Sequence, residues 1–163
     1  MLAPWKKLAA SLLAAALLNA GAGIAMAEDH HHSHDHEKPA QLTLNDGKKW
    51  PTDDNLRQSM SLIREALEAE LPTIHSGKAT TKQYRALAKK MNIQIAFMVK
   101  NCKLEPKADA MLHLVLADII AGADAMMAQG SGKARKGAEK IAHALDNYNA
   151  YFDHPDWRPL AKM

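Results

Sequence analysis

Apolar residues recur every three or four positions in four separate stretches of the chain. The inner positions of the first and second stretches are Leu56, Met60, Ile63, Leu67 and Leu71, then Tyr84, Leu87, Met91, Ile95, Met98 and Cys102. Those of the third and fourth stretches are Leu112, Leu116, Ile119, Ala123 and Met126, then Ala138, Ile141, Leu145, Tyr148 and Phe152. This period is typical of amphipathic α-helices, so the pattern predicts four helices and no convincing strand.

Residues that start or break helices separate the four stretches. The expected starts are Thr52-Asp53-Asp54, Thr80 or Thr81, Pro106, and about Lys133 after Gly130-Ser131-Gly132. A capping residue before an acidic turn, and a proline in the first turn, are both common at helix starts. Pro72 is expected to end the first helix. Short loops between amphipathic helices predict an all-α fold, an antiparallel up-down four-helix bundle over residues 42–163.

The third helix is expected to be the most buried, because Met111–Ile120 is apolar on almost every side. Ahead of the first helix, Asn45-Asp46-Gly47 predicts a turn. The chain after Phe152 is expected to form an irregular segment, which we call the strap, and its aromatic residue Trp157 is expected to pack against the helices.

The N-terminus has the pattern of a bacterial export signal. Lys6 and Lys7 precede the apolar run Leu8–Leu18, and Ala25-Met26-Ala27 matches a small-residue cleavage site. The alternative is a membrane anchor, but the run is shorter than the about 20 apolar residues that span a bilayer. We therefore expect residues 1–27 to be a signal peptide, cleaved after Ala27, and the protein to be periplasmic.

The composition of the exported chain excludes several classes of function. Loss of the two lysines lowers the net charge from +3 to +1, so no basic surface for nucleic acid is expected. The single cysteine cannot form an internal disulfide, which leaves a free thiol, an intermolecular link or a ligand. No GxSxG, HExxH, CxxC or glycine-rich phosphate loop is present, so no enzymatic activity is predicted.

Five of the nine histidines lie in one run of seven residues just after the new N-terminus: His30, His31, His32, His34 and His36. Residues 28–41 carry little to bury and are expected to form a disordered tail. Imidazoles at this density bind Cu²⁺, Ni²⁺ or Zn²⁺. Cleavage before Glu28 would make His30 the third residue, so that the α-amine, two backbone amides and the imidazole form a square-planar site for Cu(II) or Ni(II). The alternatives are a cloning tag and a solvated polar tail.

A second group of candidate ligands lies at the turn between the second and third helices. In an up-down bundle, positions equidistant from a turn lie at similar heights, which brings Met98 and Cys102 towards His113. Thiolate, thioether and imidazole suit copper, above all Cu(I). His113 is expected about 10 Å along the axis from the start of its helix. It can therefore share a metal ion with Cys102 only if Met98 lies between them. The alternative is that all three are packing residues. Trp50 and His154 are expected at the same end of the bundle.

We therefore predict a periplasmic metal-binding protein that sequesters or delivers its ion, with copper favoured and nickel or zinc as alternatives. The predicted partners are the metal ion and another periplasmic metal-handling protein, with no nucleic acid and no membrane after signal cleavage; a homodimer stays open. One alternative is a haem-binding bundle with Met60 and His143 as ligands, although His143 falls on the polar face. The other is a metal-independent adaptor or chaperone bundle.

Three groups of residues carry a resemblance to known proteins. They are Gly47-Lys48-Lys49-Trp50-Pro51-Thr52-Asp53 with Leu56-Arg57, the run Asn101-Cys102-x-Leu104 … Ala108-Asp109 … Leu112-His113, and Tyr151-Phe152-Asp153-His154-Pro155. Together they resemble a family of small exported helical proteins of proteobacteria, largely uncharacterised, some of which are associated with heavy-metal handling. The resemblance covers most of the exported chain and favours metal binding, but it implies no ligand set.

Overall fold

The computed structural model describes residues 41–128 and 130–161. Four helices account for most of them, namely α1 (Asp54–His75), α2 (Thr81–Asn101), α3 (Pro106–Met127) and α4 (Ser131–Tyr151). No strand is present in the described ranges, only two isolated bridges. The predicted all-α four-helix fold is therefore confirmed. The predicted signal peptide and the histidine cluster lie outside the described residues.

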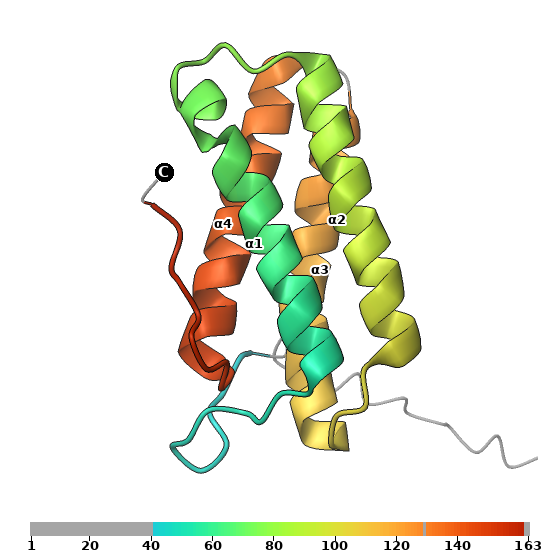
Figure 1. The fold of residues 1–163 in the computed structure, drawn as a ribbon, viewed down its shortest axis with the longest axis vertical. Coiled ribbons are helices and arrows are strands. Elements are labelled where there is room, and N and C mark those ends of the chain that lie inside the picture. The colour runs from blue at the N-terminus through green and yellow to red at the C-terminus, as the bar shows by residue number, and fades with distance from the viewer. Residues whose placement is uncertain (1–40, 129, 162–163) are drawn as a thin grey trace, which may run out of the picture. The chain divides into compact units, whose positions relative to one another are not determined.

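Each helix runs beside the next one in the chain (Figure 1). The most extensive packing joins α3 to α4, and α2 packs on both α1 and α3. Contacts between α1 and α4 close the ring, and α2 also approaches α4, whereas the backbones of α1 and α3 lie farther apart. The predicted inner positions point into the space between the helices, where all but one are buried; Cys102 is half-buried.

Local capping explains where the helices begin. The Asp53 carboxylate accepts a hydrogen bond from the Leu56 amide (2.7 Å), which satisfies one of the free N–H groups of the first turn of α1. Thr80 and Gln83 form a reciprocal capping box at the start of α2. Gly130 precedes α4 with a φ of 99°, a left-handed conformation that glycine adopts at little cost.

The predicted end of the first helix at Pro72 is wrong, because α1 continues to His75. Proline removes one backbone donor and crowds the preceding turn. Pro72 itself lies on the exposed side of α1, while Ile74 beyond it is almost fully buried. Burial of Ile74 therefore outweighs the lost hydrogen bond and extends the helix by one turn.

The prediction that the third helix is the most buried is also wrong. Eight residues are buried in α3, the same number as in α1 and in α4. By length and composition alone α3 could cross a membrane. In the bundle, its inner side forms core with α2 and α4, while Ile120 and Met127 are exposed.

Two glycines allow α3 and α4 to approach closely. A Cβ placed on Gly122 would lie 2.6 Å from the carbonyl oxygen of Gly137, and a Cβ on Gly137 would lie 2.5 Å from the carbonyl oxygen of Gly122. Real side-chain carbons do not come so close to backbone oxygens. The separation of the two helices therefore depends on both residues lacking a side chain.

The segment before α1 meets the end of α4 at the end of the bundle where α2 turns into α3. Trp50 donates its backbone N–H to Tyr151 (2.7 Å) and accepts from the N–H of Asp153 (2.8 Å), which forms a bridge with Phe152. Asp46 and Gly47, with φ of 49° and 80°, form the predicted turn just before it. We call the pairing of Trp50 with residues 151–153 the clasp. It confirms that α1 begins where α4 ends.

Candidate functional site

The turn between α2 and α3 is fixed by the start of α1. Cys102 ends α2 in an extended conformation, and Pro106 begins α3 four residues later. The second oxygen of the Asp53 carboxylate accepts the Lys103 amide (2.6 Å). The Asn55 side chain donates to the Asn101 carbonyl (2.9 Å). The residue that caps α1 therefore also holds the turn that carries the only cysteine.

An open pocket of about 340 Å³ lies beside this turn. Its walls are formed by Met98, Val99, Cys102, Lys103, Leu104, Asp109, Leu112, His113 and Leu116. All three core candidates from the sequence, Met98, Cys102 and His113, thus line one pocket. The sequence reasoning missed Asp109, although its spacing of four residues before His113 places both on one face of α3.

His113 lies at the mouth of the pocket, with about 65% of its side chain exposed. Its Nδ1 lies 2.9 Å from the main-chain oxygen of Asp109 and 3.4 Å from a carboxylate oxygen of the same residue. Both oxygens act as acceptors, so Nδ1 carries a hydrogen, and in the neutral imidazole Nε2 has the lone pair that can bind a metal ion. Orientation of one ring nitrogen by a carbonyl or carboxylate is usual for histidines that bind metal through the other. His113 lies about two turns into α3, as expected, and its side chain lies at the surface.

Cys102 is half-buried, and its thiol holds its proton tightly. Burial raises the pKa of its thiol to about 12, and the Asp53 carboxylate adds to this through its charge and a hydrogen bond, followed by the charge of Asp109. The thiol therefore keeps its proton at neutral pH and donates it towards Asp53. A metal ion would have to displace that proton, because the thiolate is the form that binds metals.

Met98 is 1% exposed and packs in the core while contributing to the pocket wall. Among the described residues, no three histidine, cysteine, aspartate or glutamate side chains lie close enough to form a metal site. What the pocket offers is an exposed imidazole, a neighbouring carboxylate, a protonated thiol and a buried thioether. That combination suits a soft ion with few ligands better than an ion that requires a full tetrahedral set.

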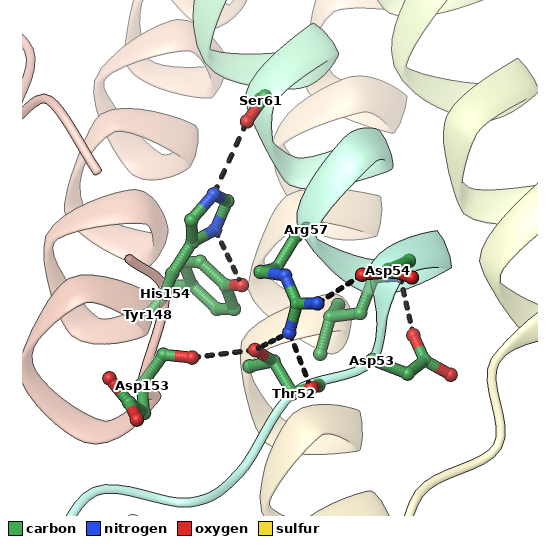
Figure 2. Close-up of polar contacts among 9 residues, drawn as sticks. Thr52, Asp53, Asp54, Arg57, Ser61, Tyr148, Asp153 and His154 are labelled. Carbon is green, nitrogen blue, oxygen red and sulfur yellow. Dashed lines mark hydrogen bonds and ion pairs between the residues drawn. The ribbon is translucent and has the colours of Figure 1, made fainter. Parts of the chain in front are cut away.

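His154 lies at the same end of the bundle but belongs to a different cluster, shown in Figure 2. Its Nδ1 lies 2.9 Å from the Tyr148 hydroxyl, and its Nε2 lies 3.5 Å from the Ser61 hydroxyl. Burial lowers the pKa of His154, and the nearby Arg57 guanidinium lowers it further. The imidazole is therefore neutral at pH 7 and has both nitrogens engaged, which makes it part of the packing under Trp157.

The same close-up shows how α1 is tied to the strap (Figure 2). Arg57 donates to the Thr52 main-chain oxygen (2.6 Å) and pairs with Asp54, and the Thr52 hydroxyl donates to the Asp153 carbonyl (2.5 Å). Burial raises the pKa of Tyr148, so its hydroxyl stays protonated. Sequence periodicity had placed Tyr148 in the core but gave no sign of these polar contacts.

The remaining candidate residues lie apart from the pocket. His75 is exposed at the end of α1. His143 is exposed on α4, as its polar neighbours predicted, beside a groove of about 510 Å³ that Leu160 of the strap also lines. Met60 is completely buried in α1. The haem alternative therefore has one candidate ligand inside the packed core and the other on the surface.

Comparison with known proteins gives no match: no family model, no curated protein and no solved structure is similar to the chain. The resemblance to exported helical proteins of proteobacteria stays a prediction.

Proposed function

We propose that this chain is an exported metal-binding protein that sequesters or delivers copper. The observation that carries the proposal is the pocket at the α2–α3 turn, where Met98, Cys102 and His113 converge from two helices. The histidine cluster from His30 to His36 supports it from the sequence. In this proposal the cluster captures ions and the pocket holds one ion more selectively.

The chemistry of the pocket favours Cu(I). Sulfur ligands and imidazole prefer this soft ion, which needs fewer ligands than Zn²⁺. Nε2 of His113 is free to bind, whereas Cys102 must first release its proton. Copper affinity at the pocket should therefore rise with pH, because each bound ion displaces one proton from sulfur.

The test compares residues 28–163 with residues 42–163, which lack the histidine cluster, in titrations with Cu(I), Cu(II), Ni(II) and Zn(II). Removal of the cluster should abolish most Cu(II) and Ni(II) binding but leave one Cu(I) site. In the shorter chain, Cys102→Ser and His113→Ala should each weaken that site at least about tenfold in competition with a chromogenic Cu(I) chelator. His143→Ala is the matched control, since His143 is also exposed but lies outside the pocket.

If neither removal of the cluster nor Cys102→Ser lowers copper stoichiometry, the metal proposal is wrong. A metal-independent adaptor would then be the better explanation. An absorbance spectrum of the purified protein addresses haem directly, because a Soret band would support a haem protein and contradict the copper proposal.

A further inference from the structure

The surface formed by α1 and α2 exposes large apolar side chains. Leu62 is 41% exposed on α1, and Ile93 and Phe97 are 64% and 38% exposed on α2. A shallow groove of about 350 Å³ runs between the two helices, lined by Leu62, Glu65, Ala66, Ala69, Lys90, Ile93 and Gln94. We call this surface the α1–α2 face. Contiguous exposed apolar side chains with a polar border are typical of protein interaction surfaces.

Charge divides the α1–α2 face along its length. The basic residues of α2 are Lys82, Arg85, Lys89, Lys90 and Lys100, and α2 has no acidic residue. On α1, Glu65 lines the groove and exposes about half of its side chain, with Arg64 3.8 Å away. The groove therefore has an acidic residue on α1 and a basic residue on α2, with the apolar side chains of Leu62 and Ile93 beside them.

We propose that two copies of this chain associate through the α1–α2 face about a two-fold axis parallel to the helices. With such an axis, α1 of each copy packs antiparallel on α2 of the other. Each residue has the same position along the bundle axis in both copies. Glu65 and Lys90 line the same groove and so lie at similar heights. Each Glu65 then meets the Lys90 of the second copy, and Leu62 meets Ile93.

The charge pattern selects this arrangement over the other two-fold arrangement. An axis across the helices would place α2 on α2, so that a helix with five basic and no acidic residues would pack against itself. Like charges held close together oppose association. The arrangement with α1 on α2 instead places Glu65 against Lys90 at two symmetry-related contacts. The apolar centre of the interface is the same in both, so the charges decide between them.

An anionic lipid surface is the main rival occupant, because basic residues around exposed Ile93 and Phe97 would attract one. Glu65 in the groove would be repelled by that surface. In a second copy, Glu65 meets Lys90 instead. The face therefore fits a copy of itself better than a membrane.

The expected dimer is weak and reversible. Two adjacent helices about 30 Å long and about 10 Å apart present roughly 600 Å² on each copy. That is below the about 800 Å² per partner of a stable complex, so the dissociation constant is expected in the micromolar range.

The test is sedimentation velocity of residues 28–163 over a range of micromolar concentrations at low and high salt, with far-UV circular dichroism confirming the fold of each variant. Ile93→Glu should weaken the dimer about tenfold or more, because it places a charge in the apolar centre. Ile120→Glu is the control, since Ile120 is an exposed isoleucine on α3, outside the α1–α2 face. Glu65→Lys and Lys90→Glu should each weaken association, and the double variant should restore it.

A monomeric wild-type protein at every concentration would overturn the proposal. So would equal effects of Ile93→Glu and Ile120→Glu, or failure of the double variant to recover. A wild-type chain that stays monomeric but floats with phosphatidylglycerol vesicles would assign the α1–α2 face to a lipid surface instead. None of these results depends on copper, so the dimer and the metal proposal fail or stand separately.

Discussion

Replacement of Gly122 by alanine tests how closely α3 and α4 must approach. The new Cβ would lie 2.5 Å from Cγ1 of Ile141 and 2.6 Å from the carbonyl oxygen of Gly137. Carbon contacts are normally about 3.5–4.0 Å, so the overlap is about 1 Å. The Ile141 side chain can rotate, but the Gly137 carbonyl belongs to the backbone of α4. The helix itself must therefore move.

The expected cost follows from two opposing effects. Alanine in place of glycine inside a helix contributes about 1 kcal/mol of stability. Overpacking a well-packed interior costs about 1–3 kcal/mol, and a clash with backbone belongs at the upper end of that range. Gly122→Ala should therefore lower the free energy of unfolding by about 2 kcal/mol, and the melting temperature by about 8 °C at about 4 °C per kcal/mol.

Gly132→Ala provides the matched control. Gly132 lies in the first turn of α4, and a Cβ placed there would meet nothing within 4 Å. This variant should be as stable as the wild type or up to about 1 kcal/mol more stable. Urea denaturation followed by circular dichroism measures both variants. A Gly122→Ala protein that is as stable as Gly132→Ala would refute the close approach of the two helices.

Two further predictions concern the titratable groups at this end of the bundle. Asp53→Asn keeps a capping side chain for α1 but removes a charge that raises the pKa of Cys102. Alkylation of Cys102 by iodoacetamide should therefore be faster, by about tenfold for each unit by which the pKa falls. An unchanged rate would contradict the contact between Asp53 and Cys102. The lowered pKa of folded His154 means that the unfolded chain binds a proton more readily, so stability should be complete above about pH 6.5 and fall as the pH drops below it. Urea midpoints between pH 5 and 8 should show a shallower slope for His154→Gln, and an identical slope would contradict the buried position of His154.

The fold was predictable because its signals are local. Caps such as Asp53 and Thr80 mark helix starts within one turn, and the inner faces follow from a fixed period. The error at Pro72 arose because burial of Ile74, a tertiary effect, outweighed a local rule. The roles of Gly122 and Gly137 had no local signal, since their contact joins two different helices.

The candidate site was predictable only in part. Bundle geometry brought Cys102 and His113 to one end, and both line one pocket. The protonation of Cys102 depends on Asp53, which is distant in sequence and reaches the thiol only in the folded chain. The exposure of His113 and its hydrogen bond to Asp109 likewise depend on side-chain direction, which the spacing of apolar residues does not specify.

The clasp gives the protein a built-in optical reporter. The chain has three tryptophans, and removal of residues 1–27 leaves only Trp50 and Trp157. Trp50 is buried in the clasp and donates its indole N–H to the Thr43 carbonyl (2.6 Å). Trp157 packs edge-on against Tyr148, 5.0 Å between ring centres. Intrinsic fluorescence therefore observes one end of the bundle, where residues about 100 positions apart must meet, and such distant contacts are expected to form late in folding. Circular dichroism reports helix formation. In a refolding experiment, the delay between the two signals therefore measures the time between formation of the helices and formation of the clasp.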